Sequence, residues 1–175
     1  MQSTSGEASL SAQDLAAEGD RLFQQQQWSA AAANYKKAIA IQPEWVLALC
    51  KLGKVSLRQA QLDKQPDNIR WAEAERWFDR ALELNAKSHL ANYGLAQVAM
   101  GRQAWAVAAE HLTRTIALKP GFIAAVYMDL GKVWQQLQQW EDAIAAYCTA
   151  LQYGQANEIY DQLAIALCAQ AGAKQ

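Results

Sequence analysis

A chain of 175 residues is about the size of one ordinary domain, so a single fold must account for nearly all of it. Hydrophobic residues make up 52% of the sequence and only 3 residues are proline, a composition that favours long helices over many short strands. The formal net charge of -1 provides no field that would attract nucleic acid or an anionic membrane, and we expect neither as a partner.

The N-terminal segment, residues 1–10, is polar and lacks the charged and apolar regions of a signal peptide. We therefore expect a flexible tail and a cytoplasmic protein. The tail ends at Ser11-x-x-Asp14 ahead of Leu15, which is the pattern of a capping box at the start of a helix.

One pattern then recurs four times, with a tryptophan, a small residue, a large residue and a second small residue at fixed offsets. These offsets place the four side chains on one stripe of a helix, because an α-helix has about 3.6 residues per turn. Another small residue upstream of each copy marks a partner helix. The copies are Trp28-x2-Ala31-x3-Tyr35-x2-Ala38, Trp71-x2-Ala74-x3-Phe78-x2-Ala81, Trp105-x2-Ala108-x3-Leu112-x2-Thr115 and Trp140-x2-Ala143-x3-Tyr147-x2-Ala150, and the upstream residues are Gly19, Gly53, Ala96 and Gly131.

The spacing of the copies gives a period of 34 residues with one insertion. Successive tryptophans are 43, 34 and 35 residues apart, and Gly53 is also 43 residues before Ala96. The nine extra residues therefore lie between Gly53 and Trp71. Residues 61–68 are the turn-rich part of that interval, and we expect them to lengthen the link between two helices, which costs little entropy.

The four copies resemble tetratricopeptide repeats, whose pattern W-x2-L-G-x2-Y…A-x3-F…P they follow in register. Proline ends the first and third repeats, whereas Ala86 and Gln155 stand at that position in the other two. Glu18 replaces a leucine, Asn92 an aromatic residue and Thr115 an alanine of the pattern. We expect the first and third repeats to pack less tightly there. The resemblance implies an all-α fold, a right-handed α-α superhelix of four helix-turn-helix repeats with a C-terminal capping helix.

The expected solenoid occupies residues 11–172, and its last element is the capping helix. That helix would present Tyr160, Leu163, Ala164 and Leu167 on one face, with Glu158, Asp161 and Gln162 on the polar outer side that closes a solenoid. The repeats are expected at about 12–45, 46–88, 89–122 and 124–157, with the insertion near 60–70 and the capping helix at about 158–169.

Residues that could carry catalysis or hold a metal are few. His89 and His111 belong to no pattern with a nucleophile or carboxylate, so we expect packing or surface roles, no enzymatic activity and no cofactor. Cys50, Cys148 and Cys168 form no CxxC pair, which argues against a zinc site and favours packing roles in a reducing compartment.

Two aromatic residues and one glutamine run fall outside the repeated pattern. Trp45 and Trp77 are either contact residues on the surface or, in the favoured interpretation, packing residues between neighbouring repeats. Residues 24–27, all glutamine, are interpreted as the solvated end of a helix.

In proteins of the resembled family, the first helix of each repeat lines a concave groove that holds a partner peptide. Some members clamp a C-terminal carboxylate with lysine and asparagine in the first repeat, but Ala16 and Asp20 stand at those positions here, so we do not expect that clamp. Carried over by register, the lining residues are Asp20, Phe23, Leu47, Cys50, Lys51, Lys54, Leu57, Arg58, Leu90, Tyr93, Gln97, Met100, Met128, Lys132 and Gln135.

This mixed apolar and basic lining favours a partner segment with apolar anchors and an acidic group. The leading hypothesis is therefore an interaction scaffold or adaptor that binds a peptide or helix of another protein in the groove. Two alternatives stay open. The chain could be the regulatory or substrate-guiding region of a larger enzyme such as a glycosyl- or methyltransferase, or it could self-assemble, with the groove of one copy receiving residues 1–10 or the closing helix of another.

Overall fold

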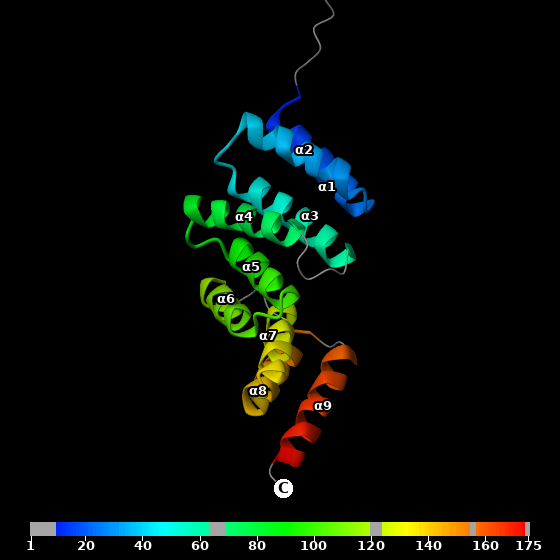
Figure 1. Cartoon of the computed structure of the whole chain (residues 1–175), viewed down its shortest axis with the longest axis vertical. Helices are drawn as coiled ribbons and strands as arrows, with labels where there is room; N and C mark the ends of the chain where they lie inside the picture. The colour runs from blue at the N-terminus through cyan, green and yellow to red at the C-terminus, as the bar shows by residue number, and fades with distance from the viewer. Residues whose placement is uncertain (1–9, 64–68, 120–123, 155–156, 174–175) are drawn as a thin grey trace, which may run out of the picture.

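The computed structural model describes residues 10–63, 69–119, 124–154 and 157–173, and over these ranges all the regular secondary structure is helical. Each helix packs on the next, and the helices stack into an elongated superhelical array with α1 near one end and α9 at the other (Figure 1). The all-α solenoid expected from the repeats is thereby confirmed. Its helices are α1 (Ala12–Gln24), α2 (Trp28–Ile41), α3 (Val46–Asp63), α4 (Ile69–Leu84), α5 (His89–Gly101), α6 (Trp105–Leu118), α7 (Ala124–Gln136), α8 (Trp140–Tyr153) and α9 (Asn157–Ala173).

The capping box at the start of α1 is confirmed. The backbone N–H of Asp14 donates to Ser11 Oγ at 3.1 Å, and the Asp14 carboxylate accepts from the Ser11 N–H, also at 3.1 Å. These hydrogen bonds satisfy two donors that the first turn would otherwise leave open. The Ser11 hydroxyl also donates to Asp14 Oδ2 at 2.6 Å, and this bond, with that from the Ser11 N–H, lowers the pKa of Asp14. The expected tail lies outside the described residues except for Leu10, which is exposed.

The two helices of a repeat approach closely because a small residue of the first faces a large residue of the second. Added to the glycine of these pairs, a Cβ would lie only 2.4 to 2.8 Å from the facing ring, so a larger residue would not fit. In the third repeat Ala96 and Leu112, both fully buried, take the two places. The glycine pairs are Gly19 with Tyr35, Gly53 with Phe78 and Gly131 with Tyr147.

The alanines of the repeated stripe are buried at helix contacts, as expected: Ala31, Ala74, Ala108 and Ala143 are each 0% exposed. The looser packing expected in the third repeat is absent. Asn92 and Thr115 are also 0% exposed, and both side chains donate to backbone carbonyls, Asn92 Nδ2 to Ser88 at 2.9 Å and Thr115 Oγ1 to His111 at 2.8 Å. Hydrogen bonding offsets the cost of burying these polar groups.

The same turn joins the two helices of the first, third and fourth repeats. Gln26, Gln103 and Gln138 adopt φ of 60°, 60° and 59°, in the left-handed region that glycine adopts more easily. The following residue donates its N–H to a carbonyl five positions back, as in the Schellman motif; Ala104 to Ala99 at 2.8 Å is one example. In each turn one glutamine therefore adopts a strained backbone conformation, and the turn gives a carbonyl at the end of the preceding helix a hydrogen-bond donor.

The insertion lengthens a helix as well as a link. α3 has 18 residues, whereas α1, α5 and α7 each have 13. Residues 61–63, expected in the link, belong to α3, because no glycine or proline interrupts the helical sequence between Gly53 and Pro66. The remainder of the expected link, residues 64–68, lies outside the described residues.

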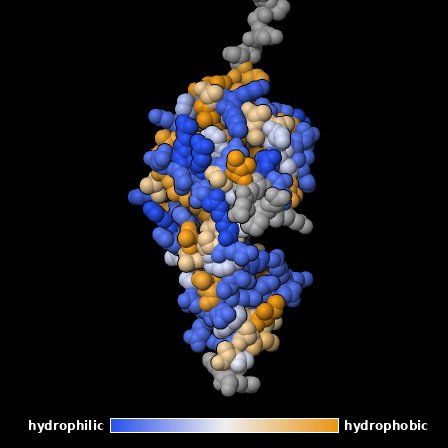
Figure 2. All heavy atoms as spheres, in the orientation of Figure 1, coloured by the Kyte–Doolittle hydropathy of each residue, from blue (hydrophilic) through white to orange (hydrophobic). Residues whose placement is uncertain are grey.

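The packing face of α9 differs from the expected one. Ile159 and Ala166 are buried, at 2% and 0% exposure, whereas Tyr160 and Leu167 are exposed. Ala166 lies 35 residues after Gly131, at the position of the small residue in each repeat. α9 thus packs on α8 in the register of a further first helix, and hydrophobic residues come to the surface over it at the lower end of the molecule in Figure 2.

The cysteines and the two unassigned tryptophans divide between core and surface. Cys50 is buried, but Cys148 and Cys168 are exposed, which corrects the expectation that all three fill packing positions. Trp45 and Trp77 are partly buried against the core of the first repeats, in agreement with the favoured packing interpretation.

Candidate functional site: a basic hollow between α3 and α5

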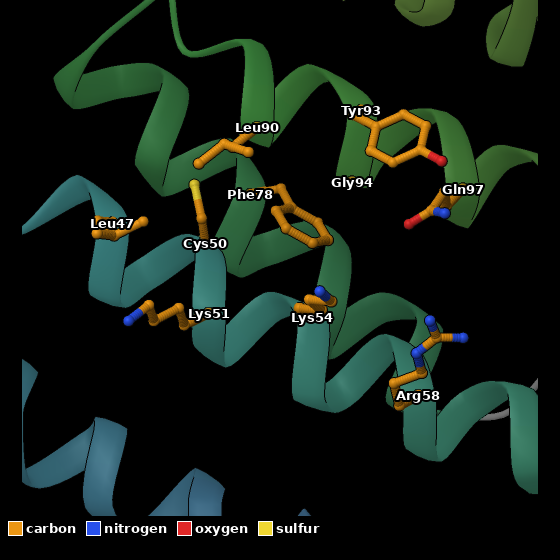
Figure 3. A pocket seen from close by; sticks show the side chains of 10 residues that line it. All are labelled: Leu47, Cys50, Lys51, Lys54, Arg58, Phe78, Leu90, Tyr93, Gly94 and Gln97. Atoms are coloured by element: carbon orange, nitrogen blue, oxygen red, sulfur yellow. The ribbon is translucent and has the colours of Figure 1, made fainter. Parts of the chain in front are cut away.

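A cavity of about 360 Å³ opens between α3 and α5 (Figure 3). Eight of the expected groove residues line it: Leu47, Cys50, Lys51, Lys54, Arg58, Leu90, Tyr93 and Gln97. Phe78 and Gly94 complete the lining. The register of the repeats thus brings together the groove residues of the second and third repeats.

Gly94 explains why a hollow forms at this point. It occupies the repeat position of Lys51 in α3 and Asp129 in α7, so it is the member of the series without a side chain. A Cβ at Gly94 would lie 2.3 Å from the Phe78 ring, which approaches because the glycine leaves room. Phe78 and Gly94 were not among the groove residues expected from the sequence, although a glycine at this repeat position indicates a gap.

The cations of the hollow differ in their partners. Lys51 Nζ lies 2.5 Å from Asp20 Oδ2, and Asp20 Oδ1 accepts from the Tyr35 hydroxyl at 2.6 Å. Figure 3 shows the Lys51 side chain directed away from Phe78. Asp20, expected to line the groove, therefore neutralises a neighbouring groove lysine.

Lys54 and Arg58 have no carboxylate partner among the described residues. Lys54 Nζ lies 5.2 Å from the centroid of the Phe23 ring, a cation–π arrangement. Arg58 Nη1 donates to Gln61 Oε1 at 3.0 Å. Both side chains are exposed, so the hollow combines two uncompensated positive charges with an apolar wall that includes Leu47 and Leu90.

The polar groove residues expected in α7 form hydrogen bonds within the chain. Lys132 Nζ donates to Glu158 Oε1 of α9 at 2.7 Å, and this bond lowers the pKa of Glu158. Gln135 Oε1 accepts from the Tyr147 hydroxyl at 2.8 Å. Burial raises the pKa of Tyr147 to about 12, so the phenol remains a donor at neutral pH.

A phenol–carboxylate pair connects α5 with α7. The Tyr93 hydroxyl donates to Asp129 Oδ2 at 2.8 Å, and burial raises the pKa of both groups. Tyr93 thus closes one side of the hollow with its ring while its hydroxyl is held by Asp129.

The other expected groove residues lie outside the hollow. Leu57 is only 2% exposed and belongs to the core, so it offers no surface to a partner. Met100 and Met128 are partly buried against the core clusters of the third and fourth repeats. Phe23 lies in an adjoining hollow at the end of α1. Among the described residues, the section between α3 and α5 thus gathers eight of the expected lining residues.

The histidine and cysteine side chains that catalysis or metal binding would require are held in packing roles or lie apart from one another. His111 Nδ1 lies 3.3 Å from Asn92 Oδ1, and burial lowers the pKa of the imidazole. Burial also raises the pKa of the Cys50 thiol. In the ranges that the structure describes, no three His, Cys, Asp or Glu side chains come together as metal ligands, and no helix there is long and apolar enough to span a membrane.

A tetratricopeptide repeat model matches residues 19–59. No curated protein matches the sequence. Among solved structures, a MamA protein is 22% identical and has a TM-score of 0.74, with 91% of this chain and 82% of that chain covered. The MamA fragment 41-end from Desulfovibrio magneticus RS-1 is 18% identical, with a TM-score of 0.77 and coverage of 93% and 87%.

A third similar structure is YrrB, described as a TPR protein with an unusual peptide-binding site. It is 15% identical, with a TM-score of 0.69 and coverage of 91% and 78%. At these identities the likeness shows the fold. The repeat model thus identifies a tetratricopeptide repeat within residues 19–59, the other copies follow it in register, and the solved structures share the fold of the chain.

Proposed function

We propose that this protein is an interaction scaffold whose basic hollow between α3 and α5 binds an acidic segment of a partner protein. The fold is one that serves protein interaction, and one protein of similar structure is described as having a peptide-binding site. The observation that carries the proposal is the placement of Lys54 and Arg58, without carboxylate partners in the described chain, beside an apolar hollow.

The size and chemistry of the hollow define the ligand. A volume of about 360 Å³ is at the small end of the range for ligand sites, suitable for one or two side chains of a peptide. Burial of one leucine or phenylalanine side chain contributes about 1.5 to 3 kcal/mol. An aspartate or glutamate of the same segment would reach the cations at the rim, giving a modest affinity that decreases as salt increases.

The proposal can be tested with a random peptide library displayed against the immobilised protein. We expect selected peptides to combine a large apolar residue with aspartate or glutamate. Isothermal titration calorimetry should then show Lys54→Glu and Arg58→Glu each weakening a selected peptide by about tenfold or more, because an attraction becomes a repulsion.

Matched controls are Arg76→Glu and Arg80→Glu, which reverse exposed charges of α4 outside the hollow. These variants should bind within about twofold of the wild type, because they lie away from the site at moderate ionic strength. Selected peptides without acidic residues, or wild-type affinity in the Lys54→Glu variant, would show that the basic hollow is not the binding site.

A further inference from the structure

A second hollow of about 500 Å³ adjoins the first, at the junction between the α1–α2 turn and the end of α3. Phe23 and Trp28 form one wall, with their rings edge to face at a centroid distance of 4.9 Å and an angle of 72°. Leu62 of α3, 62% exposed, also lines this hollow. The chain therefore presents apolar side chains of three helices around one open space.

The lengthening of α3 supplies part of this hollow. If α3 had the same length as α1, α5 and α7, which is 13 residues, it would end at Arg58. Gln61 and Leu62 line the second hollow only because α3 continues to Asp63. The nine-residue insertion thus adds surface that the other repeats lack.

The two hollows share their cations. Arg58 lines both of them, and Lys54, which lines the first, lies over the ring of Phe23, which lines the second. An acidic side chain placed between two apolar anchors would therefore meet Lys54 and Arg58 together. Charge complementarity favours a segment that crosses from one hollow to the other over one that enters the first alone.

We propose that the extension of α3 builds a second anchor site, so that the partner segment carries two apolar side chains with an acidic residue between them. This inference rests on the proposed function. The parts of α3 that line the two hollows have midpoints about 11 Å apart along the helix at 1.5 Å per residue, which an extended segment spans in about three to four residues. The recognised pattern is then two apolar residues three or four positions apart with an acidic residue between them.

The test uses a peptide selected on the wild-type protein and two shortened forms, each of which keeps the acidic residue and one of the apolar residues. Leu47→Ser alters the first hollow only and Leu62→Ser the second only, and both positions are exposed, which protects the fold. Each variant should weaken the full peptide by about fivefold or more through loss of apolar contact. One shortened peptide should respond to Leu47→Ser alone and the other to Leu62→Ser alone.

The matched control is Ile41→Ser. Ile41 is an exposed residue of α2, similar in size to leucine, and lines neither hollow. This variant should bind the full peptide and both shortened peptides like the wild type. If Leu62→Ser binds every peptide like the wild type while Lys54→Glu still removes binding, the second anchor site does not exist and the proposed function stands. If Lys54→Glu also has no effect, the proposed function itself is wrong.

Discussion

The middle section of the solenoid, α3 to α6, and its closing section, α7 to α9, carry a lysine at the same repeat position. Lys54 and Lys132 are 78 residues apart, which equals the 43 residues from Gly53 to Ala96 plus the 35 residues from Ala96 to Gly131. Lys54 lies over Phe23 without a carboxylate partner in the described chain, whereas Lys132 lies 2.7 Å from Glu158 of α9. The repeat thus determines where a side chain points, and the neighbouring helix determines whether its charge is available.

The cores of the two sections show the same contrast. Leu52 in α3 and Ile165 in α9 occupy one repeat position, yet Leu52 is 0% and Ile165 is 50% exposed. A second helix covers α3, but no described helix follows α9. Equivalent sequence positions therefore have different energetic roles in the middle and at the end of the array.

The largest expected effect tests this contrast in the core. Leu52→Ala should decrease the free energy of unfolding by about 2 to 5 kcal/mol through lost burial and a residual cavity. Ile165→Ala should cost less than about 1 kcal/mol, because half of that side chain is already in water. Urea denaturation followed by circular dichroism measures both values. A cost at Ile165 equal to that at Leu52 would mean that α9 is covered, for example by another copy.

A smaller effect is expected from overpacking. Ala143→Leu introduces three carbons at a fully buried contact between helices and should cost about 1 to 3 kcal/mol. Ala164→Leu, on the exposed face of α9, should change stability by less than about 0.5 kcal/mol. Thermal melts of the two variants make the comparison, and an unshifted midpoint for Ala143→Leu would contradict the helix register described above.

The left-handed turns should respond alike in the two sections. Gln103→Gly and Gln138→Gly remove strain at φ values of 60° and 59°, and each should raise stability by up to about 1 kcal/mol, reduced by the greater freedom of glycine in the unfolded chain. Denaturant titration of the single and double variants tests additivity. A loss of stability in either variant would show that the glutamine side chain contributes more than the strain costs.

The pH dependence should arise in the middle section, which contains both histidines, whereas α7 to α9 contain none. Burial lowers the pKa of His111 in the folded state below its ordinary value near 6.5, so the unfolded chain binds more protons. Stability from this group is complete above about pH 6.5 and decreases as pH falls through the lowered value. His111→Gln should flatten the decrease below neutral pH; an unchanged slope would assign it to other groups.

The repeat spacing predicted the fold and most of the lining of the hollow, because burial at offsets of 3, 7 and 10 depends only on helix geometry. Gly94 and Phe78 were missed, since a gap arises from an absent side chain and a ring on another element. The pairing of Lys51 with Asp20 and of Lys132 with Glu158 was also missed, because each joins residues of different repeats. The length of α3 was underestimated where polar residues continue a helix without apolar periodicity.

The most direct test of the account compares the two equivalent lysines on one selected peptide. Lys54→Gln and Lys132→Gln remove the same charge at the same repeat position, and calorimetry measures the affinity of each variant. We expect Lys54→Gln to weaken binding by about fivefold or more and Lys132→Gln to bind within about twofold of the wild type, because Glu158 already neutralises Lys132. Equal losses in the two variants, or a larger loss for Lys132→Gln, would contradict the assignment of the site to the hollow between α3 and α5.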